Sequence, residues 1–404
     1  MLSLSLLLSI SLAAPAVAVT LSPPVIGASK GGVPIAVSTT SASWNTAVLQ
    51  LRLPADEVSP QARASTMGFV GVLADAGAKV LGSAGRVQAR VTADLVTIAF
   101  GATADQPELP LRAVDAALRA LKTTKPVAAV MPAPFDAVDD DLDVDSAALL
   151  LPGKPAGLPI DGVVIDAANF KALAATVRSD RVAVGVVGAG TAVDVLARAV
   201  KLLTTAVPKA PAAAAAVVLD DKHSILVERR QDASPTTTLT WWTSSTSVAD
   251  RAAALVLAEF LGGRLARGAG RLGIVAVVSA SDRATLLAAE NQRADTLKKL
   301  TTAPPTTSEL STATTAAIRN RLSRLDDPTR LAHSLSRGLL NDDDVAGEVA
   351  AIDSTTAAAV TAAAIRFGAG VQLSRRFAPA ALPAAPVQKT TTTTTTTTTT
   401  GAKR

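Results

Sequence analysis

The 404-residue chain contains no cysteine. Disulfide bonds, thiol catalysis, thiolate metal sites and lipidation of a cysteine are therefore excluded. This absence is compatible with an oxidising compartment, but it does not by itself indicate one.

Tyrosine is also absent, aromatic residues make up 2% of the chain, and histidine occurs only twice. So few aromatic rings leave little to stack on bases, and a net charge of +5 is modest for this length. The composition therefore argues against a nucleic-acid-binding protein.

No apolar run reaches the roughly 20 residues that span a bilayer. Residues 1–18, MLSLSLLLSISLAAPAVA, instead form a short apolar stretch that ends in Ala16-Val17-Ala18. This small-x-small ending predicts a secretory signal peptide, although the lack of Lys and Arg near the start weakens that prediction. The same lack argues against a mitochondrial presequence. We expect an exported protein, periplasmic or secreted, with no transmembrane segment beyond the signal peptide.

The remaining chain is long enough for about two domains with a large core, because 49% of its residues are hydrophobic and 18% charged. Residues 209–219 are rich in Pro and Ala, which predicts a linker. Residues 379–404 are a Pro/Ala/Thr-rich tail with a basic end. Such a tail cannot bury enough apolar surface to fold, so we expect it to be disordered.

Residues 241–280 predict a helix, then a glycine- and arginine-rich loop, then a strand. The helix begins near Asp250, which can accept hydrogen bonds from the first-turn N–H groups, and its apolar residues recur every three or four positions. Gly262 and Gly263 end it, because glycine tolerates the positive φ of a C-terminal cap. Residues 274–278 are an apolar, β-branched run typical of a strand buried on both faces.

The rest of the chain alternates between strand and helix patterns. A Thr306–Glu309 capping box, in which each side chain satisfies the other residue's backbone donor, opens a helix that runs to about residue 325. The other expected strands are 33–39, 47–53, a pair within 85–100, 180–188, 223–230 and 236–242, and the other expected helices are 60–76, 109–121, 192–203 and 286–300.

Several segments carry a resemblance to one family. They are DRAAALVLAEFLGG at 250–263, LGIVAVVSA at 272–280, A-x-V-T-x-D-x-V-T at 89–97 and V-T-x-x-A-I-R-F at 360–367. The chain resembles the insulinase/pitrilysin-type metallopeptidases, which include mitochondrial processing peptidase and the core subunits of the respiratory cytochrome bc complex. The resemblance covers most of residues 24–378 and is strongest in 220–378.

The resemblance implies an α+β fold of two tandem insulinase-like repeats, each a mostly antiparallel sheet covered by helices. The implied domains are a signal peptide (1–18), an N-terminal repeat (19–208), a linker (209–219), a C-terminal repeat (220–378) and a disordered tail (379–404).

Activity in this family depends on an H-x-x-E-H motif in the first helix of the N-terminal repeat, where two histidines bind zinc and the glutamate activates water. Here that helix reads STMGFVGVLAD at 65–75 and contains no histidine, so the motif is missing from its expected place near residues 68–72. The two histidines, His223 and His333, are far apart and lack ligand spacing, which is typical of surface or singly bonded histidines. We therefore expect no metal site, no cofactor and no catalytic residue.

Active members also use an arginine and a tyrosine of the C-terminal repeat to hold substrate, and this chain has no tyrosine. Arg264, Arg267 and Arg271 fall in the matching region, and Arg267 is the counterpart of the family arginine unless a one-residue gap places an alanine there. Two interpretations stay open. The three arginines are solvated loop residues, or they form a surface that contacts substrate or a partner's carboxylates.

Three weaker patterns favour ordinary structure over chemistry. Gly188-Ala-Gly190 has the start of a dinucleotide-binding loop, but Val193 stands where the third glycine belongs. Residues 139–145, DDDLDVD, have calcium-loop spacing without the required Gly and Glu, which indicates a solvated acidic loop. No nucleophile-elbow motif surrounds any serine.

Two hypotheses follow. The first is an exported, non-catalytic insulinase-like pseudopeptidase that completes the chamber and helps hold peptide substrate for a homologous zinc-bearing subunit. The alternative is a structural or scaffolding envelope protein of the same fold with no role in proteolysis. An active enzyme with an unconventional site is the least favoured interpretation.

Overall fold

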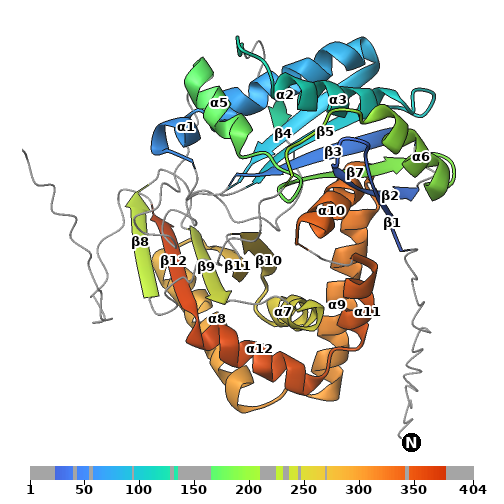
Figure 1. Cartoon of the computed structure of the whole chain (residues 1–404). Coiled ribbons are helices and arrows are strands. Elements are labelled where there is room, and N and C mark those ends of the chain that lie inside the picture. The colour runs from blue at the N-terminus through green and yellow to red at the C-terminus, as the bar shows by residue number, and fades with distance from the viewer. Residues whose placement is uncertain are drawn as a thin grey trace, which may run out of the picture.

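The computed structural model describes residues 23–39, 43–53, 58–92, 95–127, 132–134, 165–209, 224–230, 236–243, 247–268, 271–341 and 345–378. Within these ranges the chain forms two β-sheets with helices packed around them (Figure 1). The fold class is α+β, as predicted, and antiparallel pairing dominates. The expected signal peptide, the linker beyond residue 209 and the expected tail lie outside the described residues.

The first sheet collects strands from the N-terminal half of the chain. They are β1 (Val25–Ala28), β2 (Pro34–Thr39), β3 (Trp44–Arg52), β4 (Gly85–Val91), β5 (Leu95–Thr103), β6 (Ala133–Pro134) and β7 (Val182–Gly188). Their order is β1-β2-β7-β3-β5-β4-β6. The β2–β7 and β4–β6 pairs are parallel, and the other pairs are antiparallel. The expected strands of this half are confirmed, whereas β1 and β6 were not expected.

Helices cover one face of this sheet and form the main hydrophobic core with it. They are α1 (Pro60–Ala64), α2 (Thr66–Leu81), α3 (Leu109–Ala120), α5 (Ala167–Ala175) and α6 (Ala192–Leu202). The single helix expected at 60–76 is instead α1 and α2, and α2 runs on to the short 3₁₀ turn η1 (Gly82–Ala84).

One segment of this core, Thr66–Ala84, is long and apolar enough by composition to cross a membrane. Half of its most apolar window is buried inside the protein, and α2 packs on α3, β4 and β5. The same apolarity is therefore accounted for by its place in the core.

The second sheet and its helices come from the C-terminal half. The strands are β8 (Ser224–Arg230), β9 (Thr236–Thr243), β10 (Arg264–Gly268), β11 (Arg271–Ser279) and β12 (Val371–Ala378), in the order β10-β11-β9-β12-β8. The helices are α7 (Val248–Phe260), α8 (Arg283–Thr302), α9 (Thr307–Leu325), α10 (Pro328–Asn341), α11 (Val345–Asp353) and α12 (Ala357–Ala369).

The two sheets share one pairing pattern. Along β2-β7-β3-β5-β4 the pairs are parallel, then antiparallel three times. Along β8-β12-β9-β11-β10 the same sequence of directions recurs. In the first sheet the chain passes from the central strand β3 through α2 to the edge strand β4 of this five-strand set. In the second sheet it passes from the central strand β9 through α7 to β10 in the same way.

The start of α7 differs from the prediction. Ser247 is the N-cap residue, and its hydroxyl accepts a hydrogen bond from the backbone N–H of Asp250. Asp250 lies in the first turn, where its carboxylate forms an ion pair with Arg366 of α12. The end of the helix is as predicted, because Gly262 takes a φ of 58° just past the last turn. Val277 is 53% exposed, so β11 is not buried on both faces throughout.

The capping box of α9 is confirmed. The Thr306 hydroxyl accepts from the Glu309 backbone N–H, and the Glu309 carboxylate accepts from the Thr306 backbone N–H at 2.8 Å. The hydrogen bond from the Thr306 backbone, helped by the Thr306 hydroxyl, holds the pKa of Glu309 below its ordinary value.

Helix α10 belongs by sequence to the C-terminal half but packs on the first sheet, mainly on β7, β3 and β2 (Figure 1). It covers the face opposite α2 and α3, where Ala332 and Leu335 join a small apolar cluster with Val48 and Val187. The approach is very close: a Cβ at Gly185 of β7 would lie 1.8 Å from the carbonyl oxygen of Ala332. Glycine at 185 is therefore a condition for this contact.

We predict that Gly185→Ala destabilises the protein by about 2 kcal/mol or more, because a methyl group there must push α10 off the sheet. Urea unfolding measures the change. Gly101→Ala is the matched control on the same sheet, since a Cβ there would meet its nearest atoms at an ordinary 3.5 Å. Equal stability losses in the two variants would show that the α10 contact is not as close as described.

Candidate functional site

The helix in which the family's zinc motif is expected is α2, and apolar packing fills the relevant turn. Phe69 is fully buried and its ring meets that of Phe170 on α5 at 5.2 Å between centroids. A Cβ at Gly68 would lie 2.9 Å from Ile165, so this side of α2 is also in close contact. The turn that would carry metal ligands is thus part of the hydrophobic core.

The structure describes one of the two histidines. His333 is buried on α10, at 2% exposure, and His223 lies outside the described residues. Within the described ranges, no group of three or more His, Cys, Asp or Glu side chains could hold a metal ion.

The three candidate arginines do not lie in a loop as predicted. Arg264 and Arg267 belong to β10 and Arg271 begins β11, and the two strands form an antiparallel hairpin in which Gly268 pairs with Arg271. Positions three apart on a strand lie on opposite faces, so positions 264 and 267 cannot form one surface. We expected a loop because Gly and Arg interrupt the apolar pattern. The strand forms nevertheless, because its hydrogen bonds with β11 are made by the main chain and do not require apolar side chains.

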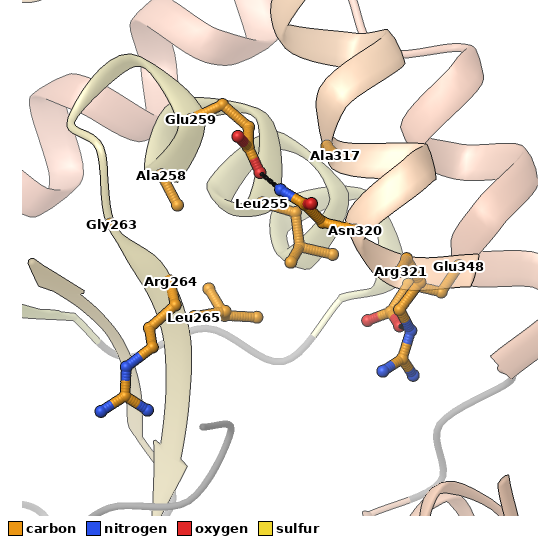
Figure 2. Close-up of a pocket in the computed structure, with 10 residues that line it drawn as sticks. All are labelled: Leu255, Ala258, Glu259, Gly263, Arg264, Leu265, Ala317, Asn320, Arg321 and Glu348. Carbon is orange, nitrogen blue, oxygen red and sulfur yellow. Dashed lines mark hydrogen bonds and ion pairs between the residues drawn. The ribbon is translucent and has the colours of Figure 1, made fainter. Parts of the chain in front are cut away.

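A small pocket opens beside Arg264, between α7, β10, α9 and α11 (Figure 2). In it, the Asn320 side-chain amide donates to the Glu259 carboxylate at 2.8 Å. Figure 2 shows the guanidinium of Arg264 directed away from this pair.

At its inner end the pocket reaches a buried charge cluster. Glu348 of α11, 4% exposed at its side chain, pairs with Arg321 of α9 at 2.8 Å and lies 4.0 Å from Arg251 of α7. Both arginine side chains are also less than 10% exposed. The cluster therefore ties three helices together with charge-assisted contacts in a poorly solvated place.

The described residues that line the pocket are carboxylates, guanidiniums, one amide and apolar side chains, with no hydroxyl, thiol or imidazole. This set can hold polar groups but supplies no nucleophile paired with a base. The cluster could not be found from sequence, because Arg251, Arg321 and Glu348 come from three helices with no common spacing.

The weak dinucleotide pattern is explained by turn structure between β7 and α6. Gly190 has a φ of 108°, and Thr191 is the N-cap whose hydroxyl accepts from the Asp194 backbone N–H. The Ala189 N–H is already engaged by the side-chain oxygen of Asn45 at 3.1 Å. With that N–H occupied and a carboxylate in the first turn, the turn is unsuited to phosphate. The acidic run 139–145 lies outside the described residues.

No protein-family profile and no curated protein sequence matches the chain. Solved structures match along most of it. An inactive peptidase M16 domain from Pseudomonas fluorescens has a TM-score of 0.62 at 14% identity, over 90% of this chain and 100% of that one. A chain of complex III from Candida albicans has a TM-score of 0.64 at 10% identity, over 87% and 95%. The periplasmic protease PqqL from Escherichia coli has a TM-score of 0.55 at 12% identity, over 89% of this chain and 46% of that one.

The chain has the peptidase M16 fold. The resemblance to insulinase-type peptidases is thus confirmed at the level of the fold, and one of the matching structures is itself described as an inactive domain. Helix α2 contains no histidine, so the H-x-x-E-H motif is missing from the helix in which the family resemblance places it.

The charge cluster allows a direct test of its structural role. We predict that Glu348→Gln lowers the free energy of unfolding by about 3 kcal/mol, because it removes the carboxylate that two buried guanidiniums share. Urea unfolding checks this. Glu108→Gln is the control, since the Glu108–Arg112 pair is solvent-exposed and should contribute little. A similar small effect for both variants would mean that the cluster is not structural.

Proposed function

We propose that the chain is the non-catalytic subunit of a two-chain peptidase, in which it completes the chamber and helps hold peptide substrate for a homologous zinc-bearing subunit. The observation that carries this proposal is the combination of an intact M16 fold with a zinc helix that has become hydrophobic core, as the Phe69–Phe170 contact shows. Unselected drift would erode packing and site together, so a retained core beside an empty site favours a binding role.

The arrangement of the sheets supports an interpretation of the chain as two tandem repeats, divided near the Pro/Ala-rich segment 209–219. Five strands of each sheet share the same order and directions. The chain also matches 46% of the periplasmic protease PqqL. A protein of this size that corresponds to about half of a longer peptidase is suited to work beside a second chain.

The alternative is a structural protein of the same fold with no role in proteolysis. The observation that favours it is the similarity to a chain of complex III, over 95% of that chain. The two functions differ in one requirement: a subunit of a peptidase must change a partner's activity, whereas a scaffold need not.

A zinc-bearing homologue assayed on a peptide, alone and with this chain, tests the proposal. We expect the chain to raise cleavage, and we expect a variant with Arg264, Arg267 and Arg271 replaced by alanine to lose about tenfold or more of that effect, since arginine contacts to substrate contribute about 1–3 kcal/mol each. Single variants then separate the two faces of β10. A control variant carries alanine at Arg112 of α3 and at Arg198 and Lys201 of α6.

A partner that is fully active alone and unchanged by either version of the chain would rule out the subunit and leave the scaffold. An equal loss in the arginine variant and the control would keep the subunit but remove the role of β10.

We also propose that the chain is exported. The support is the sequence of residues 1–18, with small residues at Ala16 and Ala18. The mature protein should begin at Val19, which intact-mass analysis of the exported protein checks. A chain found in the cell envelope with Met1 retained would contradict cleavage.

A further inference from the structure

Helices α3 and α6 contact each other and lie on the outer side of the first sheet, away from the second sheet (Figure 1). With their flanking turns, residues 104–127 and 189–209, they contain seven basic and four acidic residues. The basic residues are Arg112, Arg119, Lys122, Lys125, Arg198, Lys201 and Lys209, and the acidic residues are Asp105, Glu108, Asp115 and Asp194. This outer layer therefore carries an excess of positive charge.

The basic residues of α3 follow one stripe of the helix. Arg112 and Arg119 are two turns apart, with side chains 56% and 64% exposed, and the exposed Lys122 lies in the turn that continues the helix.

The basic residues of α6 lie close to the start of this stripe. The hydrogen bond from Arg112 holds the pKa of Glu108 below its ordinary value, and the charges of Lys201 and Arg198 lower it further. Lys201 is exposed and Arg198 is half-buried. The two helices therefore present their cations on one continuous surface.

Two carboxylates within this surface pair with two of its arginines. Glu108 pairs with Arg112 at 2.7 Å, and Asp115 pairs with Arg119 at 3.2 Å. The Asp115 carboxylate also accepts hydrogen bonds from two backbone N–H groups just after α6, at 2.9 Å each.

The carboxylates that border the surface have partners of their own. They are Asp105 with Gln106, Asp194 with Thr191, and Asp75 of the neighbouring α2 with Lys79. In the part of the chain that the structure describes, the side chains of Lys122, Arg198 and Lys201 form no hydrogen bond or ion pair. These three cations are therefore available to a ligand.

We propose that this surface, defined by Lys122, Arg198 and Lys201 with Arg112 and Arg119 beside them, binds the headgroups of an anionic phospholipid bilayer. Each basic side chain that comes within a Debye length of anionic headgroups adds to the attraction. Charges on the outer side of two adjacent helices can approach a flat bilayer together.

An exposed apolar stripe beside the cations favours a bilayer over a soluble partner. Val193 of α6 is 68% exposed, and Ala197 and Lys201 follow it at one-turn intervals. At a bilayer surface the apolar side chain can enter the headgroup region while lysine reaches the phosphates. Nucleic acid fits less well, because α3 and α6 contain no aromatic ring on which a base could stack.

This interaction goes beyond the role proposed above, because it requires neither zinc nor a second subunit. The full chain by itself can therefore be tested, and the result does not depend on the peptidase assay. That assay contains no vesicles, so the alanine variant at Arg112, Arg198 and Lys201 remains a control there.

The experiment measures sedimentation of the full chain with vesicles of phosphatidylglycerol and phosphatidylcholine, and with vesicles of phosphatidylcholine alone, at low and high salt. We expect salt-dependent binding to the anionic vesicles that falls about tenfold or more in the K122Q/R198Q/K201Q variant. The matched control, K298Q/K299Q/R319Q, removes the same charge from exposed positions of α8 and α9 and should change the affinity less than about twofold.

A charge-retaining variant, K122R/R198K/K201R, should bind within about twofold of the unchanged chain, because a bilayer attracts the charge and not one side-chain shape. Circular dichroism checks that the variants stay folded. If the triple glutamine variant does not fold, K122Q/K201Q replaces it, since both of its changed side chains are exposed.

Residues 1–18 carry no charged side chain, so attachment through them would be equal on the two kinds of vesicle. Equal binding to both would therefore overturn the proposal, and equal losses in the two triple glutamine variants would reduce the effect to net charge and overturn it as well. Full binding by K122Q/R198Q/K201Q would assign the attraction to another part of the chain, such as its basic end. Tighter binding of a polyglutamate peptide than of the vesicles would make an acid-rich protein the partner instead.

Discussion

The contact between α10 and β7 is the constraint on which the relation of the two halves depends. A helix of the C-terminal half can lie on the first sheet only if backbone meets backbone, and Gly185 against Ala332 provides that approach. Ser336 is fully buried on the same helix, and its hydroxyl donates to the backbone carbonyl oxygens of Ala332 and His333. This polar group therefore keeps its hydrogen bonds in the close contact. Near β7 the first sheet is therefore covered by helices on both faces. The helix on the second face is α10, which lies far from β7 in the sequence.

The turn of α2 at which the family resemblance places the zinc motif is part of the core. In an active peptidase a helix turn that binds zinc must present polar ligands to a solvent-filled chamber. Here the turn around Phe69 is closed by Phe170 and Ile165, which contributes to packing of the core.

Arginine is used in two physically different ways. Arg251 and Arg321 are buried around Glu348, and removal of this carboxylate would leave two guanidiniums together in a poorly solvated place, so the cluster favours the observed packing of α7, α9 and α11. Arg86 of β4 is exposed instead, and its guanidinium stacks on the Trp44 ring at the surface. The three side chains carry the same charge, and they differ in burial: Arg251 and Arg321 are buried, whereas Arg86 is exposed.

The sequence by itself determined the local elements, the empty zinc helix and the fold family, because hydrophobic period, caps such as Thr306–Glu309 and the missing histidines are readable without distant contacts. Tertiary structure decided the rest. Ser247 caps α7 because chain geometry, not residue type, chooses between it and Asp250. The expected loop around Arg267 became a hairpin because β11 offered its main chain as a partner. The position of α10 on β7, β3 and β2 depends on contacts between segments far apart in the chain, and no spacing along the sequence encodes which of them will meet.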